Sequence, residues 1–158
     1  MEISTYFFKD SCLFGPYPTA EQVLKLESMG VKYFIDLTTS YEKINRYKCN
    51  VKYISYPIRD NSIPENPDSF IDFLKFIISI IENLNSQEKI YIHCRGGHGR
   101  SGMVVACLLC ILEDLDSSKS ITLTTRFHSL RPTIKEKWIN KDCPNIKSQQ
   151  DFIKRLFG

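Results

Sequence analysis

The sequence has no long apolar run, no block of like charges and no low-complexity tract, and each absence excludes a class of protein. The longest apolar stretches, residues 70–84 and 102–112, are respectively interrupted by charge and too short to cross a bilayer. The net charge is +3 and the basic residues are scattered, which argues against a nucleic-acid-binding surface. Without linkers or repeats, the 158 residues predict a single domain spanning 1–158.

The cysteines lack the regular spacing of a disulfide framework. The first residues, MEISTYFFKD, do not combine a basic segment with an apolar core as a secretory signal does. We therefore expect reduced thiols and an intracellular location, cytoplasmic or nuclear. Cys107 and Cys110 form a C-x-x-C pair, but this pair falls inside an apolar helical segment, so we expect core packing rather than redox chemistry. The six cysteines are Cys12, Cys49, Cys94, Cys107, Cys110 and Cys143.

Strand-like and helix-like segments alternate along the chain, which is typical of an α/β fold. We interpret 117–130 as a helix although its ITLTT stretch has strand propensity. The alternation predicts a central, mostly parallel sheet of about four to five strands with helices on both faces. The expected strands lie within 4–18, 31–38, 51–58 and 89–94, and the expected helices at 18–30, 68–84, 100–113, 117–130 and 145–158.

The stretch HCRGGHGRSG, residues 93–102, joins an expected buried strand to an expected buried helix. Its glycines let the backbone curl so that successive N–H groups point inward, and the start of the next helix adds a positive end. The stretch therefore predicts an anion-binding loop. The residues expected around a bound phosphate group are Arg95, Gly96, Gly97, His98, Gly99 and Arg100.

The same letters fit two other kinds of site less well. Gly97 to Gly102 match the dinucleotide pattern G-x-G-x-x-G, but no acidic residue follows between Asp116 and Glu136 to hold a ribose. A metal site would use His93, Cys94 and His98, yet a fourth ligand at metal spacing is missing. We therefore expect no metal and no cofactor.

Cys94, Arg100 and Ser101 suit phosphoryl transfer to sulfur. Inward amides, a helix N-terminus and nearby cations can lower the pKa of a thiol from its usual value, about 8.5, so we expect Cys94 to be a thiolate. Arg100 offers the planar fork that matches phosphate oxygens, and the loop amides complete a cradle for the transferred group.

The run His93-Cys94-(five residues)-Arg100-Ser101 resembles the signature of the cysteine-dependent protein tyrosine and dual-specificity phosphatases. Two further segments strengthen the resemblance. YPIRDNSIP, residues 56–64, is similar to the family's general-acid loop, and residues 131–152 are similar to its arginine-proline and glutamine region. The arrangement looks most like the small group that includes the cyclin-dependent-kinase-associated and Cdc-fourteen-like phosphatases.

This resemblance implies a role for each matched residue. Cys94 would form a thiol-phosphate intermediate while Asp60 protonates the leaving oxygen. Gln149 would position the hydrolytic water, His93 would organise the loop, and Ser101 would ease departure of the sulfur.

Several alternatives stay open at this stage. Glu65 and Asp68 are nearby substitutes for the acid, and Gln150 is the neighbouring substitute for Gln149. Some relatives shield the nucleophile by a disulfide, for which Cys49 is the candidate partner of Cys94. Residues 45–47, Asn-Arg-Tyr, resemble a phosphotyrosine-clamping motif of much longer phosphatases. We interpret this resemblance as a coincidence.

The expected substrate is a phosphoprotein carrying phosphotyrosine or phosphoserine and phosphothreonine. A phosphoinositide or the 5′-triphosphate end of RNA is the alternative, as is an adaptor that binds phosphate without turnover. Arg95 and His98 add basic character, and we expect His98 to carry charge below about pH 6.5. Trp138 with the lysines at 135, 137 and 141 forms either a substrate-side docking patch or a solvated face. Nothing in the sequence specifies an oligomeric state.

Overall fold

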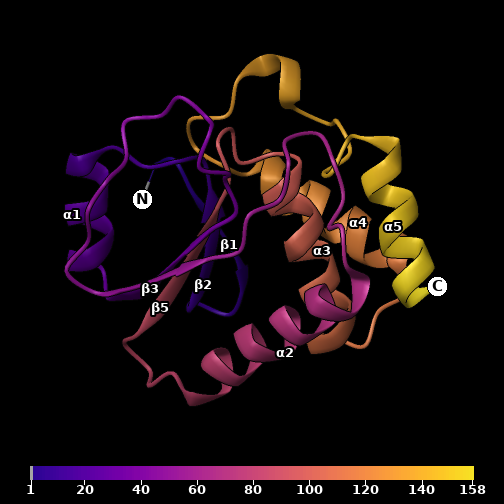
Figure 1. The fold of residues 1–158 in the computed structure, drawn as a ribbon, viewed down its shortest axis with the longest axis horizontal. Coiled ribbons are helices and arrows are strands. Elements are labelled where there is room, and N and C mark those ends of the chain that lie inside the picture. The colour runs from indigo at the N-terminus through magenta and orange to yellow at the C-terminus, as the bar shows by residue number, and fades with distance from the viewer. Residues whose placement is uncertain (1) are drawn as a thin grey trace.

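The computed structural model describes residues 2–158 as a five-stranded sheet with helices on both sides (Figure 1). The strands follow the order β1-β2-β5-β3-β4 across the sheet. β1 pairs with β2 in antiparallel fashion, and the other neighbouring pairs are parallel. The predicted mostly parallel sheet is therefore confirmed. The strands are β1 (Thr5–Phe8), β2 (Cys12–Gly15), β3 (Val31–Asp36), β4 (Lys52–Ser55) and β5 (Lys89–His93).

One helix packs on one face of the sheet and four pack on the other. The expected helix at 117–130 is confirmed, and the Asp116 side chain caps its first turn by accepting the Lys119 backbone N–H. Within residues 2–158 no helix is long and apolar enough to cross a membrane. α1 (Ala20–Ser28) covers the first face, and α2 (Pro67–Asn83), α3 (Arg100–Leu112), α4 (Ser117–Ser129) and α5 (Lys147–Phe157) lie on the second, with a 3-10 turn η1 (Glu136–Trp138) before α5.

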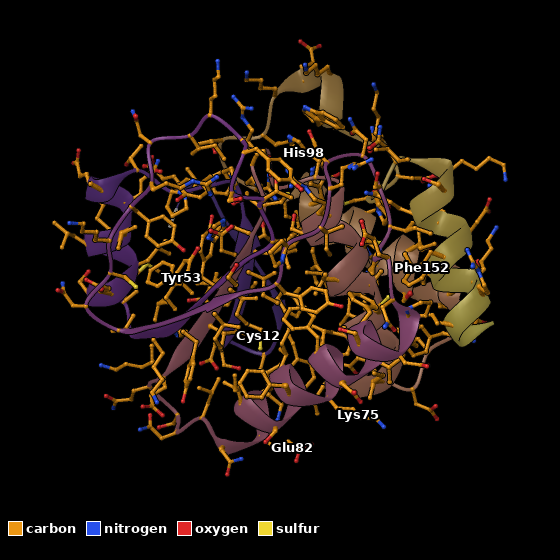
Figure 2. The ribbon with its side chains drawn as sticks, in the orientation of Figure 1. Cys12, Tyr53, Lys75, Glu82, His98 and Phe152 are labelled. Carbon is orange, nitrogen blue, oxygen red and sulfur yellow. The ribbon has the colours of Figure 1, made fainter. Side chains whose placement is uncertain are left out.

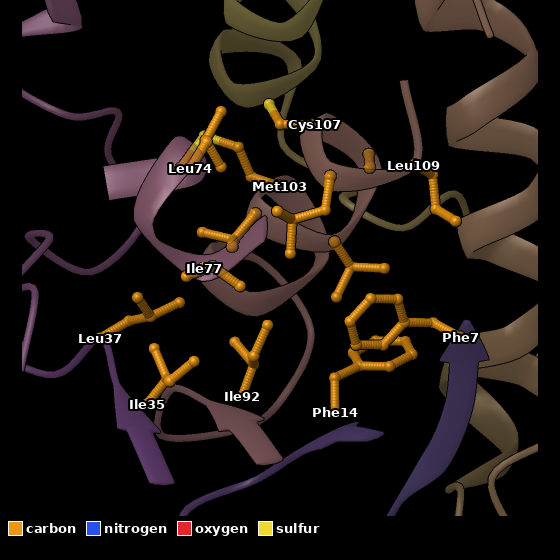
Figure 3. Close-up of a cluster of buried hydrophobic side chains, with 14 of the residues drawn as sticks. Phe7, Phe14, Ile35, Leu37, Leu74, Ile77, Ile92, Met103, Cys107 and Leu109 are labelled. Atoms are coloured by element: carbon orange, nitrogen blue, oxygen red, sulfur yellow. The ribbon is translucent and has the colours of Figure 1, made fainter. Parts of the chain in front are cut away.

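The larger core lies between the sheet and helices α2 and α3 (Figure 3). Ile35 and Ile92 project from neighbouring strands toward Leu74 and Ile77 of α2, and all four are buried. Cys107 packs in this core without solvent exposure, as expected for an inert thiol. Because α3 is buried along almost its whole length, its first residue is fixed in position at the end of β5.

Candidate active site

The loop of residues 94–99 joins β5 to α3 and holds the Cys94 sulfur in a buried position. The Gly97 backbone N–H donates to Cys94 Sγ at 3.3 Å, and the Ser101 hydroxyl lies 3.4 Å from the same sulfur. Gly97 has a φ of +76°, and a Cβ there would lie 2.4 Å from the Gly15 carbonyl carbon. The curl that turns the amides inward therefore requires glycine at this position.

Arg100, the first residue of α3, is almost fully buried at 1% exposure, so its charge needs a partner. Its two terminal nitrogens donate to the two carboxylate oxygens of Glu42 at 2.8 and 2.9 Å. Nη1 also donates to the Ile58 carbonyl at 3.0 Å, and Nη2 lies 3.4 Å from an Asp60 carboxylate oxygen. Nε is buried and has no partner. Glu42 thus occupies the end of the guanidinium fork and leaves the Nε edge for another acceptor.

Glu42 is a site residue that sequence reasoning missed. Its carboxylate also accepts the Thr39 backbone N–H and hydroxyl, at 2.6 and 3.0 Å. The hydrogen bonds from Arg100 lower the pKa of Glu42 to about 2, so the carboxylate is charged at neutral pH. A single glutamate in a polar loop between two strands gives no pattern from which this contact could be predicted.

A cavity of about 340 Å³ opens above the loop and brings Cys94 together with Asp60. The Asp60 carboxylate accepts the Asn61 backbone N–H at 3.0 Å and is 59% exposed, at the rim of the cavity. The alternative acids Glu65 and Asp68 do not line this cavity: Glu65 lines a separate hollow and Asp68 lies in the first turn of α2. The geometry therefore favours Asp60 among the three carboxyl groups.

Gln149 of α5 lies against the phosphate loop, beside Gly99. Its side chain is buried, its Nε2 donates to the Ser62 carbonyl at 3.0 Å, and a Cβ on Gly99 would lie 3.1 Å from its Oε1. That Oε1 has no partner and is free to accept a hydrogen bond from a water molecule. Gln150 instead donates to the Pro144 carbonyl, so it does not take this place.

His93 is buried behind the loop between two hydrogen bonds. Its Nδ1 lies 3.1 Å from the Cys94 carbonyl, and its Nε2 lies 2.7 Å from the Tyr47 hydroxyl. Because a carbonyl can only accept, Nδ1 carries the proton and Nε2 accepts from Tyr47. Burial is the main reason that the pKa of His93 falls to about 4, which keeps the ring neutral.

The Asn-Arg-Tyr run, interpreted from sequence as a coincidence, lies beneath this loop. Tyr47 holds His93 as described, and Arg46 donates to the Thr38 hydroxyl and the Thr39 carbonyl, both at 2.6 Å. The segment that supplies Glu42 is thereby tied to the end of β3. None of the three side chains lines the cavity above Cys94, so the run has a structural role here and gives no sign of clamping a substrate ring.

His98 differs from the expectation of a histidine that gains charge near pH 6.5. Its Nδ1 lies 2.7 Å from His128 Nε2, and its ring stacks on Trp138 with centroids 3.8 Å apart. Burial, followed by the nearby Arg131 guanidinium, lowers the pKa of His98 to about 3. The ring therefore stays neutral well below pH 6.5, and the expectation that it gains charge there was wrong.

The other cysteine and metal hypotheses gain no support from the geometry. All six thiols are free, and Cys49 donates to the Val51 carbonyl at 3.4 Å instead of pairing with Cys94. Within residues 2–158 no three His, Cys, Asp or Glu side chains gather as a metal site.

Comparison with known proteins places this geometry in a family. Residues 15–141 match the family model PTP-SAK, described as Swiss Army Knife protein, DSP-PTPase phosphatase domain. The chain is 38% identical to a protein named as a tyrosine phosphatase, 067L of Invertebrate iridescent virus 3, over all of this chain and 67% of that protein. It is 42% identical to 197R of Invertebrate iridescent virus 6, also named as a tyrosine phosphatase, over 92% of this chain and 50% of that protein.

The chain thus spans between half and two thirds of the length of these viral relatives. Among solved structures, Tk-PTP in its active form has a TM-score of 0.75 at 21% identity, covering 98% of this chain and 95% of that one. The likeness to Tk-PTP confirms the fold class, and the family model confirms the phosphatase class expected from the sequence. The chain belongs to the DSP-PTPase phosphatase domain family.

Proposed function

We propose that this domain hydrolyses phosphotyrosine, and phosphoserine or phosphothreonine, in proteins through a phosphate bound covalently to Cys94. The observation that carries the proposal is the cavity in which the Cys94 sulfur accepts the Gly97 backbone N–H while Asp60 lies at the rim. A thiolate at the base of an anion-binding loop can attack phosphorus, and a carboxylic acid at the rim can protonate the leaving oxygen.

In the first step the Cys94 sulfur forms a bond to phosphorus while the bond from phosphorus to the substrate oxygen breaks. Asp60 transfers its proton to that oxygen, so the product leaves as an alcohol or phenol. In the second step water attacks phosphorus, the sulfur–phosphorus bond breaks, and Asp60 takes a proton from the water. The free Oε1 of Gln149 accepts the other water proton as a hydrogen bond and so orients the attack.

Arg100 binds the transferred group through the edge of its guanidinium that Glu42 leaves open. The unpartnered Nε–H donates to one phosphate oxygen and the adjacent Nη2 proton to a second. Glu42 holds the other end of the fork, so the guanidinium is oriented before substrate arrives.

A phosphoprotein is the substrate class that the named viral relatives support. PTPMT1, solved in complex with PI(5)P, has the same fold at a TM-score of 0.64, which keeps a phosphoinositide as the second candidate. Turnover of each substrate class distinguishes the two candidates.

The test is phosphate release without added metal from a phosphotyrosine peptide, a phosphothreonine peptide, a phosphoinositide and triphosphorylated RNA. We expect release from the peptides, and abolition of that release by Cys94→Ser. Cys49→Ser is the matched control and should retain turnover, since Cys49 contacts Val51 and not the loop. Release confined to lipid or RNA would overturn the protein-phosphatase proposal, and activity that persists in Cys94→Ser would overturn the assigned nucleophile.

Asp60→Asn separates the acid from the nucleophile. Because a poor leaving group needs protonation, turnover of phosphotyrosine peptide should fall by about 100-fold or more while that of an activated aryl phosphate falls much less. Glu65→Gln is the matched control on the same loop. Equal, small losses on both substrates would reassign the acid.

A further inference from the structure

Several carbonyl groups of the phosphate loop, residues 94–99, accept hydrogen bonds from donors outside the loop. Each peptide of this loop is trans and planar, so its N–H points away from the side on which its carbonyl is bound. A donor on the outer side therefore turns the next amide N–H toward the catalytic cavity. The bound carbonyls and their donors are Cys94 with His93 Nδ1, Arg95 with the Tyr17 backbone N–H, Gly97 with Arg131 Nη2, and His98 with Cys143 Sγ.

Cys143 supplies the last of these donors from the segment that precedes α5. It is 1% exposed, and its Sγ lies 3.2 Å from the His98 carbonyl oxygen. Because a carbonyl can only accept, the sulfur carries the proton of this hydrogen bond. Burial raises the pKa of the Cys143 thiol above its usual value, which keeps the thiol protonated at neutral pH.

Contacts with three helices hold the Cys143 thiol in place. The Cys143 backbone N–H donates to the Thr125 hydroxyl of α4 at 2.9 Å, and the carbonyl of the next residue, Pro144, accepts from Gln150 of α5 at 2.7 Å. A Cβ on Gly102 of α3 would lie 2.5 Å from Cys143 Sγ. The sulfur therefore lies in space that a side chain at position 102 would fill, and glycine at that position lets the thiol reach the loop.

We propose that Cys143 is a positioning residue, which fixes the His98–Gly99 peptide so that the Gly99 N–H donates to an oxygen of the transferred phosphoryl group. The inference rests on the proposed function and adds a residue to the site that performs it. Gly99 lines the catalytic cavity, where its N–H can meet a phosphoryl group held at Cys94. Cys143 does not line that cavity, so it acts through the peptide and does not touch the substrate.

A thiol is a weak donor, but the peptide that it orients faces the charge that develops during phosphoryl transfer. Removing one amide-type donor to a developing oxyanion costs about 100-fold or more in rate. Cys143 orients such a donor without supplying it, and Gly99 is also held by the Met103 N–H, which donates to the Gly99 carbonyl at 2.9 Å. Loss of the thiol should therefore remove only part of that effect, about fivefold.

The experiment compares the wild type with Cys143→Ala and Cys143→Ser by kcat/KM for a phosphotyrosine peptide and by the inhibition constants of vanadate and inorganic phosphate. Vanadate can adopt the trigonal-bipyramidal shape of the transferred group, whereas phosphate is tetrahedral. In Cys143→Ala we expect kcat/KM to fall by about fivefold, the vanadate constant to rise by a similar factor, and the phosphate constant to rise by less than about twofold. Serine keeps a donor at this position, so Cys143→Ser should stay within about twofold of the wild type in all three quantities.

Cys107→Ala is the matched control, because it also removes one buried sulfur, in this case from the core between the sheet and helices α2 and α3. We expect it to lower the urea unfolding midpoint as Cys143→Ala does. It should leave kcat/KM and both inhibition constants at their wild-type values.

The outcomes separate this inference from the proposed function. Failure of the wild type to release phosphate from the peptide would refute the proposed function. Turnover by the wild type with unchanged kinetics in Cys143→Ala would overturn the positioning role alone. The same role would be overturned if Cys143→Ser lost as much activity as Cys143→Ala, if Cys107→Ala lost it too, or if the vanadate and phosphate constants rose equally, since each result would indicate a packing effect.

Discussion

Glu42→Gln is the perturbation that most sharply tests how the buried charge of Arg100 is held. In the wild-type chain the Glu42 carboxylate accepts two hydrogen bonds from Arg100 at 2.8 and 2.9 Å, and the side chains of Glu42 and Arg100 are 12% and 1% exposed. Removing one member of a buried pair costs about 3–5 kcal/mol when no other partner remains. Here the Ile58 carbonyl and the Asp60 carboxylate remain nearby, and glutamine keeps one acceptor, so we expect the free energy of unfolding to fall by about 2 kcal/mol.

The assay is urea unfolding at pH 7 with and without inorganic phosphate. Because a bound oxyanion supplies the charge that glutamine lacks, phosphate should stabilise Glu42→Gln more than it stabilises the wild type. Glu82→Gln on the exposed side of α2 (Figure 2) is the matched control and should change stability by less than about 0.5 kcal/mol. A Glu42→Gln variant as stable as the wild type, with no greater response to phosphate, would refute the reasoning that Glu42 is the counter-ion of Arg100.

Three further predictions follow from the buried groups around the loop. The pKa values of the three histidines are lowered to about 3 or 4 in the folded protein. Below pH 6.5 the unfolded state therefore binds more protons than the folded state, and the free energy of unfolding should fall as the pH drops from 6.5 toward 4. The expected fall is about 1.4 kcal/mol per pH unit for each proton taken up on unfolding. Urea unfolding midpoints at pH 7, 6 and 5 measure this fall, and a midpoint that does not change with pH would contradict the prediction. In His128→Gln the pH dependence of the midpoint should be less steep. Tyr47→Phe should cost about 1–2 kcal/mol of stability and lower kcat several-fold, because it leaves buried His93 Nε2 without its donor, whereas Tyr41→Phe at an exposed position should be neutral. Gln149→Ala should leave the initial burst of product intact and slow the steady state, as seen in rapid-quench kinetics; loss of the burst itself would show that Gln149 acts in the first step.

The parts of the site that were predictable from sequence are those with a local pattern. Residues 93–102 join a strand to a helix and separate Cys94 from Arg100 by five residues, so this short segment alone predicts a phosphate-binding loop with a cysteine nucleophile. The sheet and helices were predictable for a similar reason, since alternating short apolar strands and helical stripes are local signals. The stretch 117–129, whose sequence has both helix and strand features, forms a helix that buries the face carrying Ile121 and Thr124.

The parts that were not predictable depend on contacts across the fold. Glu42 reaches Arg100 only because the 39–50 loop passes over the end of β5, and no spacing rule connects positions 42 and 100. The charge state of His98 depends on its burial against Trp138 and on the nearby Arg131 guanidinium. The residues next to His98 in the sequence do not predict either contact. A tertiary ion pair and a desolvated ring are properties of the assembled structure.

The central claim is that phosphate passes through the sulfur of Cys94. The most direct test is to mix Asp60→Asn enzyme with an activated aryl phosphate, quench in acid within milliseconds, and examine the digested protein by mass spectrometry. The account predicts one added phosphoryl group on the peptide that contains Cys94, absent when the variant also carries Cys94→Ser. Rapid turnover with no phosphorylated Cys94 peptide at any quench time, or the phosphoryl group on another residue, would contradict it.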